Sequence, residues 1–153
     1  MTIAGLDAPI RARDIDSIIE FLPRLQSLDP NQAARWPEIR RTGEKEFEIY
    51  RGEDHPLVTE FIKALYQHGL VRDFDWPKWQ PEAMRLYDHP EALKKARMKT
   101  CVKLLTLHAR KDRFVDRHFA SMVQFGHIAA VLSRMAEIRR KWRNELSVDS
   151  DQS

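Results

Sequence analysis

Side chains that bind metals, anions or protons gather between residues 108 and 127. His108 and Asp112 lie four residues apart, so a continuous helix would place both on one face, where they could share a metal ion. The segment lacks the His-Glu-x-x-His spacing of a zinc protease, and its arginines repel a cation. The sequence therefore predicts no metal site and no cofactor, and these histidines are interpreted as hydrogen-bonded structural groups.

Arg110 and Arg113 flank a predicted helix end, where a guanidinium group can act in two ways. It can bond the last free carbonyl groups of the helix or a carboxylate of the same chain, which is a structural role. It can instead hold a phosphate with two hydrogen bonds. A bond within the chain is the expectation, but both interpretations stay open. The candidate residues for a ligand or anion are Arg110, Arg113, His118 and His127.

Nucleophilic catalysis has little support in the sequence. Cys101 is the only cysteine, so no intramolecular disulfide can form. It lies close to the apolar face of a predicted helix, where a buried thiol would be unreactive. Ser121 and His118 are about one helical turn apart but lack a third partner, and no Gly-x-Ser-x-Gly or phosphate-binding glycine motif is present. An enzymatic role stays open only for a pocket built from the arginine and histidine candidates.

The charges are distributed unevenly along the chain. The net charge is +3, but residues 94–143 contain 14 lysines and arginines against three acidic residues, whereas residues 1–93 have a balance of −5. Such a basic half is typical of a surface for nucleic acid or another polyanion, or of a surface that docks on the acidic half of the same molecule or of a second copy. The candidate nucleic-acid contacts are Lys95, Lys99, Lys103, Arg139, Arg140, Lys141 and Arg143.

The spacing of apolar residues predicts a mainly helical protein. Pro23 is expected to kink or stop the first helix near Leu22, because proline cannot donate a backbone hydrogen bond. Asp14 is a candidate cap for this helix. Further helices are expected at residues 56–69, 81–87, 98–110, 119–126 and 128–142.

The segments between these helices are expected to be turns or extended chain. Residues 73–79 are predicted to form an aromatic-rich turn, and Asp88 with Glu91 a capping box. Residues 29–42 are predicted to be irregular, with Trp36 anchored in the core.

Together these elements predict an all-α fold, a compact multi-helix bundle with at most one short strand or hairpin near residues 46–51. Residues 1–146 are expected to form a single domain and residues 147–153 a disordered tail. Four residues on three apolar stripes are expected in one core: Leu65, Leu105, Leu132 and Met135.

A resemblance to a known family covers roughly residues 57–136. It is carried by Leu104-Leu105-Thr106, Arg110, Arg113-Phe114, His118-Phe119, Gly126-His127 and, upstream, Asp75-Trp76. On these residues the chain resembles a bacterial family, domain-of-unknown-function family 6508. The family has a glycine where this chain has Arg117, which weakens the expectation of a tight turn at that point. The resemblance implies no activity, but it directs attention to the arginine and histidine candidates.

The sequence is best interpreted as a non-enzymatic binding or interaction module that uses its basic C-terminal half, with nucleic acid or a protein as the partner. The alternatives are a small enzyme with an arginine and histidine pocket, and a structural homodimer. No apolar run approaches the roughly 18–20 residues that cross a bilayer, and the first residues do not resemble a secretory signal. A cytoplasmic protein with no membrane contact is therefore expected.

Overall fold

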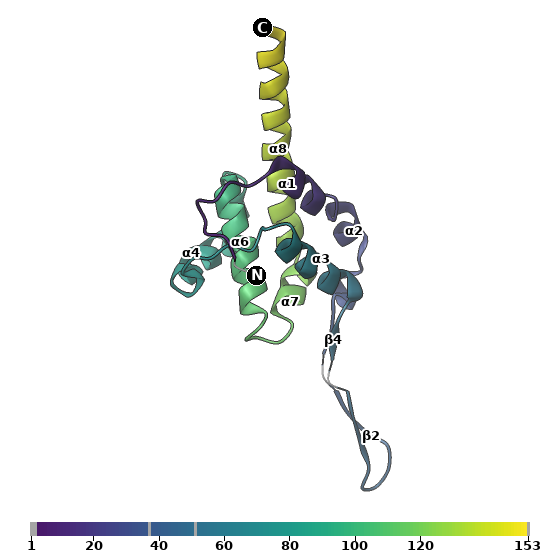
Figure 1. The fold of residues 1–153 in the computed structure, drawn as a ribbon. Helices are drawn as coiled ribbons and strands as arrows, with labels where there is room; N and C mark the ends of the chain where they lie inside the picture. The colour runs from purple at the N-terminus through teal and green to yellow at the C-terminus, as the bar shows by residue number, and fades with distance from the viewer. Residues whose placement is uncertain (1–2, 37, 51, 153) are drawn as a thin grey trace.

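The computed structural model describes residues 3–36, 38–50 and 52–152, and it is mainly helical, as predicted (Figure 1). Its helices are α1 (Ala12–Ile19), α2 (Leu22–Ser27), the short 3-10 helix η1 (Pro30–Gln32), α3 (Pro56–Gln67), α4 (Trp76–Asp88), α5 (Pro90–Leu93), α6 (Met98–Lys111), α7 (His118–Gln124) and α8 (His127–Gln152). Its strands are β1 (Ala34–Arg35), β2 (Glu38–Arg41), β3 (Phe47–Tyr50) and β4 (Glu53–Asp54). Helix α6 contacts α4, α7 and α8.

A hydrophobic core holds the helices together. Leu65 of α3, Leu105 of α6, and Leu132 and Met135 of α8 are fully buried in it, which confirms the prediction from their apolar stripes. Burying a side chain of this size stabilises the fold by about 1.5–3 kcal/mol relative to leaving it exposed. The same core fixes the positions of α4, α6 and α7, the helices around the site described below.

The first helix ends where the proline requires it. Helix α1 stops at Ile19, and Pro23 lies in the first turn of α2, where a missing N–H breaks no helical hydrogen bond. The capping prediction for Asp14 was wrong, because the residue lies inside the first turn and is buried. Its carboxylate accepts hydrogen bonds from Arg11 at 3.1 Å and from His68 at 3.0 Å. A contact with the end of α3 therefore replaces local capping.

Residues 73–79 are not the turn that the sequence predicts, because α4 already begins at Trp76. The carboxylate of Asp75 accepts a hydrogen bond from the backbone N–H of Lys78 at 3.3 Å and caps this helix. The aromatic residues of the segment therefore lie on the first turns of a helix.

Pro81 lies inside α4 and does not open it. Because Pro81 has no N–H, the carbonyl of Pro77 lacks its helical partner. The side chain of Gln80 donates to that carbonyl at 3.4 Å. This local replacement allows the helix to continue through a residue that the sequence analysis interpreted as a start.

The predicted capping box at Asp88 and Glu91 is also wrong. Asp88 is the last residue of α4, and α5 begins after His89 without any side-chain cap. The box was predicted because α4 was expected to end one residue earlier.

An antiparallel two-stranded arm projects from the bundle (Figure 1). Strand β1 pairs with β4 near the helices, and β2 pairs with β3 farther out. The strand expected near residues 46–51 is confirmed as β3, but residues 29–42 are not irregular throughout, since they contain its partner β2. Trp36 is 50% exposed beside this arm, so its predicted place in the core was wrong. Strand pairing brings these residues together, and no pattern within residues 29–42 reveals it.

The tight turn before α7 is present although no glycine stands there. Arg117 adopts the left-handed conformation, with φ of 60°. Its Nε donates to the carbonyl of Arg35 at 3.1 Å, and its guanidinium lies 6.0 Å from the centre of the Trp36 ring. These contacts tie α7 to the base of the arm and offset the backbone strain.

Two substitutions of Arg117 are expected to distinguish two contributions to the free energy of unfolding: the side-chain contacts of Arg117 and the strain of its left-handed backbone. Arg117→Ala and Arg117→Gly both lose the side-chain contacts, but only glycine also relieves the left-handed backbone, which is worth about 1 kcal/mol. Arg117→Ala should be less stable than the wild type, and Arg117→Gly should be about 1 kcal/mol more stable than Arg117→Ala. Urea denaturation measures both. Equal stabilities would contradict the left-handed turn.

Helix α8 continues to Gln152 and extends beyond the rest of the bundle (Figure 1). The disorder expected for residues 147–153 stays a prediction. Within the described ranges, none of the helices has the length and apolar character needed to cross a membrane.

Candidate functional site

A cavity of about 170 Å³ lies between α4, α6 and α7. Its lining includes Met84 and Tyr87 of α4, His108 and Lys111 of α6, and His118 and Met122 of α7. His118 and Met122 are one helical turn apart, so α7 presents both on one face. Three separate parts of the sequence therefore build the cavity, which we call the histidine cavity.

His108 and His118 bond each other directly in the wall of the histidine cavity. Nδ1 of His108 lies 2.9 Å from Nε2 of His118, and the ring centroids are 5.1 Å apart. Since only one hydrogen fits between the two nitrogens, one ring donates and the other accepts. This bond joins α6 to α7 across the loop between them.

His127 extends the cluster behind this pair. Its ring packs edge-to-face against His108 at 5.0 Å and against Tyr87 at 5.1 Å between centroids. His108 and His127 are 4% and 6% exposed, and the Nε2 atom of each is buried without a hydrogen-bond partner. Buried polar atoms are rarely left without partners in folded proteins, so these two nitrogens mark the cluster as more than a packed core.

Burial keeps the three imidazoles uncharged at neutral pH. Burial and, after it, His127, His118 and Lys111 hold the pKa of His108 well below its usual range. Burial, followed by Lys111 and His127, lowers the pKa of His118 to about 4, and burial lowers that of His127 to about 4. A neutral imidazole keeps a free lone pair. The cluster therefore presents uncharged rings with nitrogen lone pairs, and no positive charges, to a ligand.

Arg110 and Arg113 are not part of the cavity lining. Within the described residues neither guanidinium makes a hydrogen bond or an ion pair, so the expected bond to a carboxylate or a helix carbonyl is wrong. The backbone explains this result, because N–H groups of the following turn already occupy the last carbonyls of α6, including those of His108 and Lys111. Arg110 and Arg113 stay ligand candidates, but they do not line the cavity that His108 and His118 line.

Asp112 does not share a ligand site with His108. Its carboxylate accepts a hydrogen bond from the backbone N–H of Phe119 at 2.9 Å and so caps α7 from the preceding loop. Burial raises the pKa of Asp112 in spite of that bond. Among the residues that the structure describes, no three His, Cys, Asp or Glu side chains form a group that could hold a metal ion.

The two nucleophile candidates have structural surroundings. Cys101 is fully buried, as its helix position predicts, and burial raises the pKa of its thiol to about 12. The hydroxyl of Ser121 donates to the carbonyl of Arg117 at 2.9 Å and does not bond His118. Neither residue is presented to the histidine cavity.

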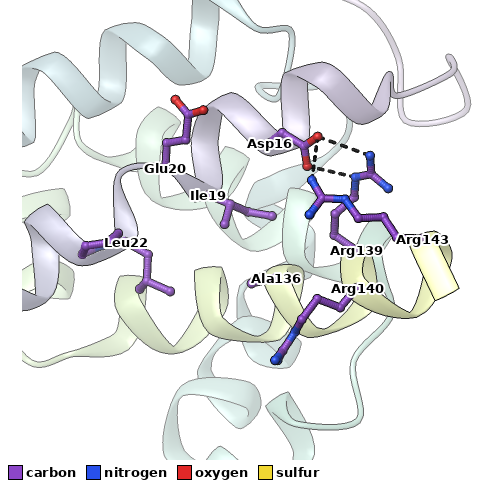
Figure 2. A pocket seen from close by; sticks show the side chains of 9 residues that line it. Asp16, Ile19, Glu20, Leu22, Ala136, Arg139, Arg140 and Arg143 are labelled. Atoms are coloured by element: carbon purple, nitrogen blue, oxygen red, sulfur yellow. Dashed lines mark hydrogen bonds and ion pairs between the residues drawn. The ribbon is translucent and has the colours of Figure 1, made fainter.

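Two arginines of the basic C-terminal half form ion pairs with a carboxylate of α1 (Figure 2). Arg139 donates to both oxygens of Asp16, at 2.9 Å and 3.2 Å, and Arg143 contacts the same carboxylate at 3.1 Å. Arg140 points away from them (Figure 2). These residues line a hollow of about 420 Å³ between α1, α2 and α8, and the ion cluster in its wall has one carboxylate for two guanidinium groups.

In the part of the chain that the structure describes, some of the remaining basic candidates have side-chain partners and others have none. Lys99 pairs with Asp7 at 2.8 Å, and Lys141 with Glu137 at 3.5 Å, both in exposed positions. Lys103 lies 4.5 Å from the centre of the Trp79 ring, a cation–π contact. Within the described chain, Lys95 and Arg140 make no side-chain hydrogen bond or ion pair. Of the seven candidates, Lys99, Arg139 and Arg143 thus pair with carboxylates of the N-terminal half of the same molecule.

His108 is the central residue of the histidine cavity. The sequence pointed to it only as a possible metal ligand paired with Asp112, and not as a partner of His118. The sequence does hold a signal for it, because it is a polar residue between two apolar ones, Leu107 and Ala109, on a helix whose neighbouring residues are mostly apolar. Met84 and Met122 carry no such signal, since methionine is an ordinary residue of helix faces.

Replacing Asp16 by asparagine should remove a pH-dependent contribution to stability. Burial acts to raise the pKa of Asp16, but hydrogen bonds and charges from Arg139 and Arg143 outweigh it and lower that pKa below 3.8. The folded state therefore binds the proton less readily than the unfolded state, so the contribution is present above pH 3.8 and is lost as the pH falls further.

Asp16→Asn should lower the free energy of unfolding by about 1 kcal/mol at neutral pH, and the difference from wild type should shrink in more acid solution. Urea titrations at several pH values measure it, with Asp88→Asn at an exposed position as the control. A difference that stays constant down to about pH 3 would contradict the lowered pKa.

Comparison with known proteins places the chain in a family. A family model described as a family of unknown function, DUF6508, matches residues 10–141. The match includes the N-terminal third, which the resemblance in the sequence did not cover. No curated protein and no solved structure matches the chain.

Proposed function

Because the chain belongs to the DUF6508 family, whose function is unknown, we propose a function from its own geometry: a non-enzymatic binding module whose ligand occupies the histidine cavity. One observation carries this proposal. The Nε2 atom of His108, a residue that lines this cavity together with His118, is buried without a hydrogen-bond partner, and so is Nε2 of His127, whose ring packs on His108.

The size and lining of the cavity limit the ligand. Typical pockets for drug-sized molecules measure about 300–1,000 Å³, so a cavity of about 170 Å³ accommodates only a small molecule or an ion. Cys101 is buried with a raised pKa and Ser121 bonds the backbone, so neither supplies a nucleophile. The enzyme alternative has less support, since Arg110 and Arg113 lie outside the cavity lining.

Methionine methyl groups provide a direct test of this cavity. The protein carries 13C-labelled methionine methyls and is titrated with small aromatic and heteroaromatic fragments. The signals of Met84 and Met122 should shift, whereas that of Met135, fully buried in the core, should not. Ala83→Leu, which fills part of the cavity, should abolish the shifts. If no fragment moves Met84 or Met122, the proposed cavity site is wrong.

A second candidate is contact with nucleic acid through the basic half. The supporting observation is that Lys95 and Arg140 are exposed and without side-chain partners among the described residues. Duplex DNA binding should then weaken with salt by a log–log slope of about −0.9 for each phosphate contacted.

Replacing both Lys95 and Arg140 by glutamine should make that salt slope shallower by about two phosphate contacts, with little change in stability because exposed charges contribute little. A fluorescence titration against random duplex DNA measures the slope, and the charge-neutral change Arg140→Lys serves as the control. An absence of binding at low salt would eliminate this candidate.

A homodimer or another protein partner is a third candidate. Its support is the exposure of two large apolar side chains on the arm, Ile39 at 75% and Phe47 at 63%. Sedimentation of the wild type against Ile39→Ser tests it, and a monomer in both cases would eliminate self-association. The cytoplasmic location expected from the sequence stays a prediction.

A further inference from the structure

We propose that the histidine cavity binds a soft monovalent metal ion of the copper(I) class through the imidazoles of His108 and His118 and the thioethers of Met84 and Met122. The inference rests on the proposed binding function, since it names the ligand of the same cavity. These four side chains come from α4, α6 and α7 and line one space.

The two histidines already approach each other as ligands of a shared ion do. Nδ1 of His108 and Nε2 of His118 are 2.9 Å apart and share one hydrogen, so one nitrogen carries it and the other directs its lone pair toward it. Metal–imidazole bonds of about 2.0–2.1 Å in a tetrahedral site place two nitrogens about 3.3 Å apart. The donor ring binds an ion through this nitrogen once its hydrogen moves to the other nitrogen of the same ring, which leaves both imidazoles neutral. An opening of a few tenths of an ångström then lets both nitrogens bind one ion.

The two methionines supply the remaining donors and decide the class of ion. Met122 follows His118 by one turn of α7, and Met84 stands across the cavity on α4. Met84 is 56% exposed, so its flexible side chain can move toward an ion without disturbing the core. Thioether sulfur is a soft ligand that selects copper(I), while imidazole accepts it as well.

The charges around the cavity exclude a harder, divalent ion. Lys111 is in the lining, and no carboxylate is among the lining residues in the described part of the chain. A divalent ion would bring two charges into a half-buried space with nothing to offset them, whereas a monovalent ion brings one. The absence of a group of three His, Cys, Asp or Glu side chains in the described residues agrees with this, because thioethers lie outside that set.

Anaerobic competition with the chromophoric chelator bicinchoninate tests the proposal on the full chain. The protein should withdraw a single equivalent of copper(I) from the chelator and should leave zinc(II) with a comparable chelator. Met84→Leu with Met122→Leu, a nearly volume-conserving change, should weaken copper(I) binding about tenfold or more. His118→Ala should weaken it further, and His89→Ala, at an exposed position, should have no effect.

The outcomes separate this proposal from the one on which it rests. Failure to withdraw copper(I), tighter binding of zinc(II), or copper(I) binding that the methionine and His118 variants leave unchanged would each overturn the metal proposal. Fragment-induced shifts of Met84 and Met122 without copper(I) binding would overturn it while the cavity site stands. The methionine variants keep the test valid if His118→Ala folds poorly.

Discussion

Replacing Arg72 by methionine is expected to lower the free energy of unfolding by about 3 kcal/mol. The side chain is buried, with 6% of the residue exposed. Its Nε donates to the carbonyl of Gly69 at 2.7 Å, Nη1 to those of Gly5 at 3.1 Å and Ala8 at 2.9 Å, and Nη2 to that of Pro9 at 3.2 Å. Methionine fills similar space but leaves these carbonyls without donors.

The loss of Arg72 should also release the N-terminal segment. Residues 5–9 are held by this guanidinium and by the backbone bond from Asp73 to the carbonyl of Ala4 at 2.8 Å. Urea denaturation gives the stability, and hydrogen exchange at residues 5–9 gives the local effect. Arg85→Met, at an exposed position, is the matched control. A loss no greater than that of the control would mean that water replaces the guanidinium without cost.

Leu105→Ala is expected to lower the free energy of unfolding by about 2–5 kcal/mol. Leu105 is fully buried at the centre of α6, the helix that contacts α4, α7 and α8. Truncation removes buried methyl groups and leaves a cavity that the surrounding helices close only in part.

Ile39→Ala, which removes a comparable side chain from the exposed arm, is the control for Leu105→Ala. It should change the stability by less than about 0.5 kcal/mol. Chemical denaturation of both variants under the same conditions measures the difference. A value below about 1 kcal/mol for Leu105→Ala would contradict the central place of α6 in the core.

The arrangement of the helix ends shows where local reasoning works and where it fails. Pro23 ends a helix because its missing N–H is a property of one residue. Pro81 does not, because Gln80 replaces the lost bond and Asp75 has already started the helix. A proline thus removes one backbone N–H donor and leaves one carbonyl without its helical partner. Whether the helix continues depends on whether a neighbouring side chain donates to that carbonyl.

The candidate site was only half predictable for a similar reason. His118 and His127 were candidates from the sequence, and the structure places both in the cluster around His108. Arg110 and Arg113 were candidates on the same grounds, yet backbone groups occupy the helix end that they were expected to bond. Which polar groups remain without partners depends on the hydrogen bonds of the whole fold. The spacing of residues in the sequence does not reveal those bonds.

The sequence by itself determined the helical class, the core residues such as Leu105 and Met135, and the family, because apolar period and local motifs are written in neighbouring residues. Only the tertiary structure decided that Asp16 pairs with Arg139 and Arg143, and that His108 meets His118 beside Met84. These contacts join residues far apart in the chain or separated by a loop. Their partners are chosen by helix packing, whose geometry no single segment specifies.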